Sequence, residues 1–435
     1  MSVWPKVFAI LLIGYTLWGR SFAYLGIPSL KLFVGEGILV AFALFKPKKL
    51  FGAWMGWLLG RGGYPFIGWS LVLFALYGVL QALRGWYMGH DALQIAENLV
   101  FNVYPLYLFF GYWMGKYYPF LLRRVVYFFA YLNALYGLTY LAFLNRFGFT
   151  LPWASDVPLF GQPSSSVIAI LGILALGRGR LADMLLVAAN LVVMLGVQVR
   201  GEWLAFAVGL LAWGLLFGRV SRLAALGLVG LILLLVLWAL DVRVPAPEHR
   251  GGELSVQGVV ARILAPINPE AAAGLVGEEA YSFAGTIVGW RVPWWQAIWA
   301  TVHGSPETAV LGLGYGFPLW SLYDQIPEGV RTPHNAFFYA LGYSGWVGVG
   351  LFFLFLFSVG TPLFRAFARH SLPEVGLVAT LWAGLIASAL FGNFFETPFG
   401  AIPFYSLMGF GLGLVWRHFQ GAHPSAPHPL PAAGR

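Results

Sequence analysis

The sequence predicts an all-α protein that crosses a membrane about twelve times. Of its 435 residues, 59% are hydrophobic and only 10% are charged, and the mean hydropathy is +0.76. A soluble domain contains about 25% charged residues, so this chain is too apolar to dissolve as one. Most of its apolar runs are 14 to 20 residues long. About 20 residues of helix are needed to cross a bilayer, so single helices fit these runs.

The apolar runs favour helices over the strands of a membrane barrel. Barrel strands alternate polar and apolar residues, whereas these runs are apolar on every side. A helix also satisfies its own backbone hydrogen bonds within lipid. The chain contains no cysteine, which excludes disulfides and thiolate metal sites.

Basic connectors set the predicted topology, because Lys and Arg collect on the cytoplasmic side. One cluster of basic residues combines positions 46–49 with position 61. The others lie at 116–124, 178–180, 219–222, 365–369 and 417. Two crossings between neighbouring clusters predict spans near 6–19, 30–45, 65–83, 97–115, 125–143, 164–177, 181–199, 202–217, 223–240, 335–360, 374–392 and 402–416. Both termini are then cytoplasmic. The short apolar piece 50–59 is expected to rest on the inner membrane surface.

These spans divide the chain into four parts. Residues 1–240 hold transmembrane helices one to nine, 241–334 form an extracytoplasmic loop, 335–419 hold helices ten to twelve, and 420–435 form a disordered cytoplasmic tail. The loop contains five Arg and nine acidic residues, so any arginine that matters there acts individually. The formal charge of +9 therefore reflects topology, and no nucleic-acid partner is expected.

An Arg-Gly pair interrupts the apolar run 181–217, which is longer than one span and flanked by basic clusters. The run is therefore expected to form a hairpin whose tip is Arg200, Gly201 and Glu202, with the glycine permitting the turn. At the outer interface Arg200 has two interpretations. It snorkels to lipid phosphates, or it offers a bidentate fork to a phosphate held at the interface.

Two further candidate residues belong to the predicted loop, Arg291 within it and His334 at its end. Arg291 falls in the tryptophan-rich stretch "GWRVPWWQAIW", an expected amphipathic helix, where it is either an interfacial anchor or a second phosphate ligand. His334, in "RTPHNAFF", is expected in the first turn of the next helix and is either structural or a general base. A helix N-terminus disfavours the imidazolium, and Asn335 beside it is placed to orient the ring or a sugar hydroxyl.

The remaining motifs carry less chemistry. "GLGYGFP" reads as a turn and lacks the Gly-Lys-Ser/Thr of a phosphate loop, and no stretch has the spacing of metal ligands. Glu396 is expected to balance charge within the structure. An ion pair between its carboxylate and an outer arginine is a second interpretation. A segment with Arg84, His90 and Asp91 is a weak candidate for an acceptor site.

Taken in order, these features resemble the O-antigen ligase and polymerase superfamily of bacterial membrane glycosyltransferases. The resemblance rests on the Arg-Gly pair, the arginine in a tryptophan-rich helix, "GLGYG" and "PHNAFFYALGYSGWVGVGLF". It is sharpest between about residues 195 and 355, and its most specific part is the His-Asn pair before a glycine-containing apolar helix. The family often has Ser before the arginine of the hairpin, whereas Val199 stands here.

The resemblance implies an undecaprenyl diphosphate-linked glycan as donor and a lipid, glycan or protein hydroxyl as acceptor. Transfer would invert the anomeric centre, without metal or other cofactor, at the outer face of the bacterial plasma (inner) membrane. Arg200 and Arg291 would hold the diphosphate, His334 would accept the proton of the acceptor, and Asn335 would support it.

Several functions remain open at this point. Within the family, a ligase, a polysaccharide polymerase and a protein O-oligosaccharyltransferase differ in their acceptors, and the single large loop favours the ligase plan. A transporter of lipid-linked sugars is the alternative of another class. Transporters usually place charges near the bilayer midplane in interrupted helices, whereas the candidate charges here lie at the predicted outer ends.

Overall fold

The computed structural model describes residues 3–27, 32–163, 165–245, 253–265, 267–284, 287–327 and 329–422. Helices dominate these residues, and the strands among them form three two-stranded antiparallel sheets. The predicted all-α class is therefore confirmed. The sheets pair β1 (Gly26–Ile27) with β2 (Leu32–Phe33), β3 (Thr150–Leu151) with β4 (Ala154–Pro158), and β5 (Arg243–Pro245) with β6 (Glu253–Ser255).

Each predicted span contains a helix, and one contains two helices joined by a 3₁₀ turn. These helices are α1 (Trp4–Trp18), α3 (Val34–Phe45), α5 (Pro65–Tyr87), α6 (Ala92–Val103) with η2 (Tyr104–Leu106) and α7 (Tyr107–Tyr117), α8 (Leu121–Ala142), α9 (Ser166–Leu176), α10 (Leu181–Val197), α11 (Arg200–Leu216), α12 (Val220–Ala239), α17 (Ala336–His370), α18 (Pro373–Ser388) and α19 (Pro398–Ala422). Short elements between them are α2 (Arg20–Ala23), α4 (Pro47–Leu58) and η3 (Leu144–Arg146).

Within the described residues, five helices are long and apolar enough to cross a membrane: α5, α8, α12, α17 and α19. Five more are apolar but shorter: α1, α3, α9, α10 and α18. The composition of these helices supports a membrane protein. The count of twelve crossings remains a prediction.

The predicted loop 241–334 is partly helical. It contains α13 (Val256–Leu264), α14 (Pro269–Ala284), a π-helical turn (Ile287–Arg291), α15 (Val292–Val302), α16 (Pro306–Leu311) and η6 (Leu319–Leu322). The amphipathic pattern of the tryptophan-rich stretch appears in α15, where Trp294, Ile298 and Val302 are buried at intervals of four residues. This face packs toward α17, so α15 is fixed on the bundle.

The C-terminal helix is longer than the sequence predicts. α19 continues to Ala422, whereas the disordered tail was expected to begin at residue 420. The rest of the predicted tail, 423–435, lies outside the described residues.

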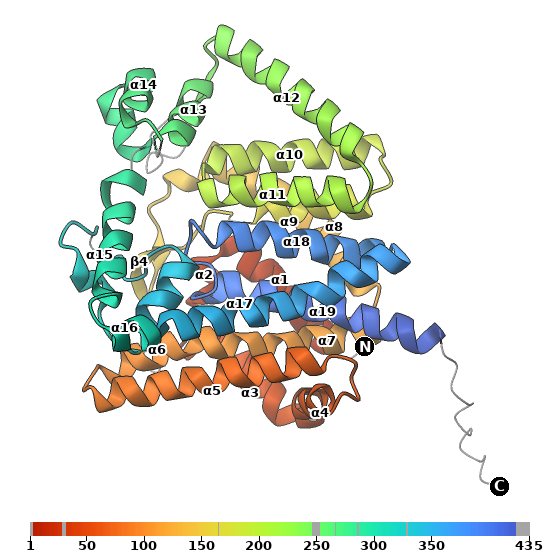
Figure 1. Cartoon of the computed structure of the whole chain (residues 1–435). Helices are drawn as coiled ribbons and strands as arrows, with labels where there is room; N and C mark the ends of the chain where they lie inside the picture. The colour runs from red at the N-terminus through yellow and green to blue at the C-terminus, as the bar shows by residue number, and fades with distance from the viewer. Residues whose placement is uncertain are drawn as a thin grey trace.

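Figure 1 shows how the helices are layered. α17, α18 and α19 lie between α5, α6 and α7 on one side and α8 to α11 on the other. α12 leans away from this bundle, and many of its apolar side chains are exposed. Such a helix is suited to contact with lipid rather than with water.

The apolar piece 50–59 forms most of α4, which packs against the bundle. The Trp57 ring is fully buried, with its centroid 4.9 Å from that of Phe109, 5.1 Å from that of Tyr112 and 5.4 Å from that of Tyr64. Aromatic pairs at such separations stabilise a contact beyond the area they bury. α4 is therefore anchored to α5 and α7 through one tryptophan.

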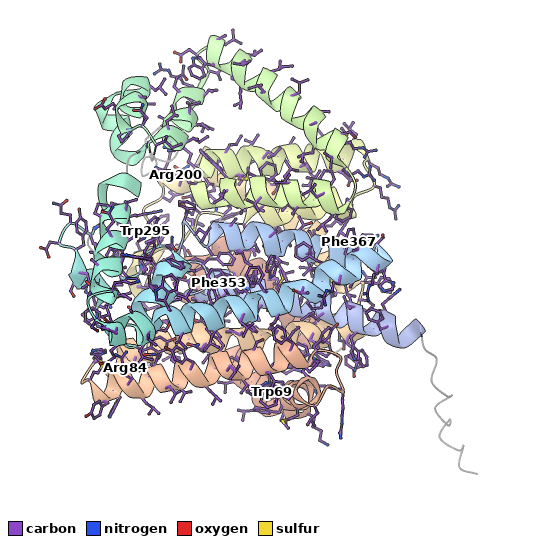
Figure 2. The ribbon with its side chains drawn as sticks, viewed as in Figure 1. Trp69, Arg84, Arg200, Trp295, Phe353 and Phe367 are labelled. Carbon is purple, nitrogen blue, oxygen red and sulfur yellow. The ribbon has the colours of Figure 1, made fainter. Side chains whose placement is uncertain are left out.

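The basic clusters of the sequence gather at one end of the bundle. There the Lys116 ammonium lies 3.4 Å from the Trp416 ring centroid, linking the ends of α7 and α19. An ion pair of 3.1 Å joins Arg123 at the start of α8 to Glu374 at the start of α18. Figure 2 shows Phe367 at this basic end and Arg84, Arg200 and Trp295 at the opposite end. The candidate residues are thus separated from the basic clusters by the length of the helices.

A break in α17 receives the "GLGYG" segment. Gly345 has φ 60° and ψ −167° inside the helix, a conformation accessible almost only to glycine. At this break the carbonyls of Gly342 and Tyr343 accept hydrogen bonds from the backbone N–H groups of Leu313 (2.8 Å) and Gly314 (3.1 Å). The "GLGYG" turn therefore lies against the helix that begins beside His334.

We predict that Gly345→Ala destabilises the protein by about 1–3 kcal/mol, because alanine is strained at this φ and ψ. A Cβ there would also collide with the Val310 carbonyl and the Gly312 N–H group. The melting temperature of the purified protein in detergent measures the effect. The control is Gly350→Ala in the same helix, where the position is open and alanine should stabilise slightly. Equal melting temperatures for the two variants would contradict the role given to Gly345.

Candidate functional site

Asn335 starts α17. Its backbone is extended, and its side-chain oxygen accepts hydrogen bonds from the N–H groups of Phe337 (2.9 Å) and Phe338 (3.2 Å). This is the arrangement of a helix N-cap, which satisfies donors that have no partner inside the helix. His334 consequently lies just before the helix, and the prediction that it belongs to the first turn is corrected.

The start of α17 is hydrogen-bonded to the chain that follows α18. The Asn335 amide donates to the carbonyl of Leu390 at 2.8 Å, and the N–H of Ala336 donates to the carbonyl of Ala389 at 2.9 Å. Both side-chain ends of Asn335 are thus engaged with backbone. Asn335 therefore fixes the backbone beside His334. Its role in orienting the imidazole or a sugar hydroxyl stays a prediction.

Arg291 reaches the same segment from the loop. It is the last residue of the π-helical turn, and its Nη1 donates to the carbonyl of Phe391 at 3.2 Å. The guanidinium carbon lies 5.1 Å from the ring centroid of Trp290, within the range of a cation–π contact. We call residues 388–391 the junction segment, because the start of α17 and Arg291 both bind to it.

His334 lies beside Arg291 and Trp290. Its φ of 51° is left-handed, and the Trp290 ring meets its imidazole edge to face, with centroids 5.7 Å apart. The ring makes no hydrogen bond to another described residue. Burial, together with the positive charge of Arg291, lowers the pKa of His334 to about 3. The imidazole is therefore neutral at neutral pH.

The neutral state of His334 was expected from the helix N-terminus. In the structure its main cause is burial, followed by the nearby guanidinium. Trp295 contributes to that enclosure: its Nε1 donates to the carbonyl of Pro333 at 2.7 Å, and its ring stacks on Phe338 with an interplanar angle of 10°. Trp290 thus lies against the imidazole, and Trp295 holds the residues on either side of it.

Arg200 begins the helix that packs against the junction segment. α10 ends at Val197, Gln198 makes the turn with a left-handed φ of 58°, and α11 starts at Arg200. The hairpin is as predicted, but Gly201 lies within α11 and does not make the turn. Its missing side chain permits close packing, since a Cβ there would lie 3.2 Å from the Ser388 Oγ.

The structure therefore brings Arg291 and His334 together from two parts of the chain. Arg200 begins a helix whose next residue, Gly201, packs against Ser388 of the junction segment. Figure 2 shows Arg200 and Trp295 at the same end of the bundle. The region combines a neutral imidazole, the Arg291 guanidinium and the Trp290 ring. A guanidinium beside a neutral imidazole can bind an anion next to a proton acceptor.

Sequence reasoning missed the junction segment, because it contributes backbone carbonyls rather than side chains. The available signal was the "FGN" that begins at its last residue, Phe391, and marks the end of a helix. Glu396, a few residues later, was expected to balance an arginine. Its carboxylate instead is buried without a hydrogen-bond partner among the described residues. Burial raises its pKa to about 8, although the nearby N–H groups of residues 394–396 act against this.

The weak acceptor-site candidates hold structure in place. Arg84 donates to the carbonyl of Gly312 at 2.8 Å and pairs with Glu307 at 3.0 Å. The Nδ1 of His90 lies 2.9 Å from the carbonyl oxygen of Tyr315, and Asp91 caps α6. Arg84 and His90 therefore fix the "GLGYG" turn against the end of α5 and the connector to α6. This role accounts for their contacts without an acceptor.

The fold and the junction define a helical membrane protein with a polar site at one end of its bundle. No protein-family model matches the chain, and no curated protein matches it. The residues that the structure describes contain no group of three or more His, Cys, Asp or Glu that could hold a metal ion.

We predict that Asn335→Ala lowers stability by about 1 kcal/mol, because the first turn of α17 loses its cap. Asn335→Ser is the matched control: serine also caps helices but does not reach Leu390. Thermal unfolding of the two variants therefore separates the cap from the bond to the junction segment. Identical melting temperatures would show that the cap contributes nothing.

Proposed function

We propose that the protein is a glycosyltransferase that moves a glycan from an undecaprenyl diphosphate carrier to a hydroxyl acceptor, as O-antigen ligases do. One observation carries the proposal: a neutral His334 lies beside Arg291, and the Arg200 helix packs on the same junction segment. The family resemblance supplies the substrate class. The site would face the outer side of the bacterial inner membrane.

Each residue then has a role in the transfer. Arg291 and Arg200 bind the diphosphate, whose charge grows as it leaves, and fixed guanidinium groups in a partly buried site stabilise that charge strongly. The acceptor oxygen bonds to the anomeric carbon while the bond from that carbon to the diphosphate breaks. The electron pair leaves with the diphosphate, and the acceptor proton passes to His334. Attack opposite the leaving group inverts the anomeric centre, and no metal is required.

Binding of the donor would also adjust His334. In the free protein its pKa of about 3 makes it a weak base, because a general base is most effective near the ambient pH. A diphosphate on Arg291 cancels the positive charge that lowers the pKa of His334 and adds negative charge nearby. Both changes raise that pKa. The donor thus activates the base.

The acceptor separates the related alternatives. A polysaccharide polymerase would use a second lipid-linked glycan, and a protein O-oligosaccharyltransferase would use a serine or threonine hydroxyl. A transporter of lipid-linked sugars would need no base, so His334 would be dispensable for it. Mass analysis after incubating the purified protein with a lipid-diphosphate oligosaccharide and candidate acceptors distinguishes these products.

We predict that His334→Ala lowers the transfer rate about 10²- to 10⁴-fold, the usual contribution of a general base. The assay follows glycan transfer in vesicles that contain the purified protein. His303→Ala is the matched control: His303 lies in the same loop but stacks on Trp299 and accepts a bond from Trp346. Full activity of the His334 variant would overturn the assignment of the base.

We predict that Arg291→Lys is nearly as harmful as Arg291→Ala, because an ammonium cannot reproduce the planar fork of a guanidinium. The turnover of both variants, compared at saturating donor, tests this geometry. Arg331→Lys is the control, since Arg331 is exposed and lies over Trp320. A lysine variant with normal turnover would refute bidentate binding.

The pH dependence provides a separate test. His334 has a lowered pKa in the free protein, so it stays neutral until the pH falls toward 3. The acid limb of kcat/KM, which reports the free enzyme, should therefore lie well below pH 6.5. The acid limb of kcat should lie at higher pH, because bound diphosphate raises the pKa of His334. An acid limb of kcat/KM at or above pH 6.5 would contradict the buried, neutral histidine.

A further inference from the structure

An arginine-lined cavity of about 880 Å³ lies at the basic end, away from the candidate site. It forms where the turn between α4 and α5 meets the C-terminal parts of α17 and α19. Its lining residues come from three stretches, 60–67, 358–369 and 415–419. The volume falls within the usual range of ligand pockets.

Three arginines give this cavity its charge: Arg61, Arg365 and Arg369. Arg365 and Arg369 are four residues apart in α17, so they lie on one face of the helix. Arg61 approaches from the glycine-rich turn "GRGG". None of the three pairs with a carboxylate among the described residues, and the lining contains no acidic residue. Three positive charges therefore share one space without internal compensation.

The rest of the lining is largely apolar and aromatic. Phe66, Ile67, Pro362, Trp416 and Phe419 contribute to it. Phe66 and Phe419 are exposed at their helix ends. A cavity with cationic and apolar parts suits an amphiphile whose charged group meets the arginines while its chains follow the apolar side chains.

We propose that this cavity binds the phosphate headgroup of an anionic lipid. The three uncompensated guanidinium groups attract a phosphate and can donate charge-assisted hydrogen bonds to it, and basic pockets between membrane helices recognise such headgroups. The apolar lining favours a lipid over a soluble phosphate, which would leave that surface uncovered. This site is separate from the glycan-transfer site and does not depend on the proposed function.

Native mass spectrometry of the purified protein, titrated with phosphatidylglycerol, tests the proposal. The wild-type protein should retain phosphatidylglycerol in preference to zwitterionic phosphatidylcholine. Each arginine replaced by glutamine should weaken retention about fivefold, from the usual contribution of a basic residue near an anionic lipid surface. The variants are Arg365→Gln alone and the triple change Arg61→Gln, Arg365→Gln and Arg369→Gln. If the triple variant does not fold, the single variant Arg365→Gln still tests the proposal.

The matched control changes three arginines at the same end that do not line the cavity: Arg124, Arg219 and Arg222. It removes equal charge, so it should retain the lipid as the wild-type protein does. Equal losses in both triple variants would show that the basic end attracts lipid only through its total charge and would overturn the site. Unchanged retention in the cavity variants would overturn it as well.

A competition experiment distinguishes binding of a lipid from binding of a soluble phosphate. Glycerol phosphate, which carries the same phosphate without acyl chains, should displace phosphatidylglycerol only at far higher concentration. Displacement at similar concentration would mean that the cavity recognises a soluble phosphate, contrary to the proposal.

Discussion

Hydrogen bonds to the carbonyls that follow α18 hold the candidate site together. The last carbonyls of a helix lack partners inside it, and here Ala389, Leu390 and Phe391 accept from Ala336, Asn335 and Arg291. Backbone groups are costly to leave unpaired near lipid, so these bonds constrain where α17 starts and how the loop approaches it. The position of His334 follows from that constraint, because it lies between the capped helix and the tryptophans of the loop.

Periodicity and charge were sufficient to predict much of this architecture. The apolar run 181–217 is too long for one span and has an arginine in its middle, which predicted the hairpin whose second helix begins at Arg200. The spacing of the tryptophans predicted α15. The details of the site required coordinates. Carbonyl acceptors leave no mark on side-chain patterns, so the sequence indicated at most the end of a helix near Phe391 and not the bonds that the junction segment accepts. Several residues also have structural roles that the residue type alone did not predict. Asn335 caps a helix, Gly201 permits packing instead of a turn, and Arg84 binds a loop.

Two breaks in the helices, one in α17 and one between α6 and α7, are relevant to the alternative that the protein is a transporter. Transporters use interrupted helices to line an ion or substrate path near the bilayer centre. The break in α17 is occupied by backbone of the "GLGYG" turn, whose Tyr315 is buried and hydrogen-bonded to Asn102. The break between α6 and α7 contains Tyr104, which donates to Glu36 at 2.7 Å. Both interruptions are thus occupied by protein, which favours a static scaffold around the site at the bundle end.

The dependence of α17 on residues 389–391 also bears on biosynthesis. A ribosome completes the two arginine-bearing segments and the histidine before it reaches the acceptor carbonyls of residues 389–391. Until α18 has emerged and packed, the beginning of α17 has no acceptors for Asn335 and Ala336. The nascent chain therefore carries Arg200, Arg291 and His334 before these acceptors exist, and this region assembles only after α18 has been made.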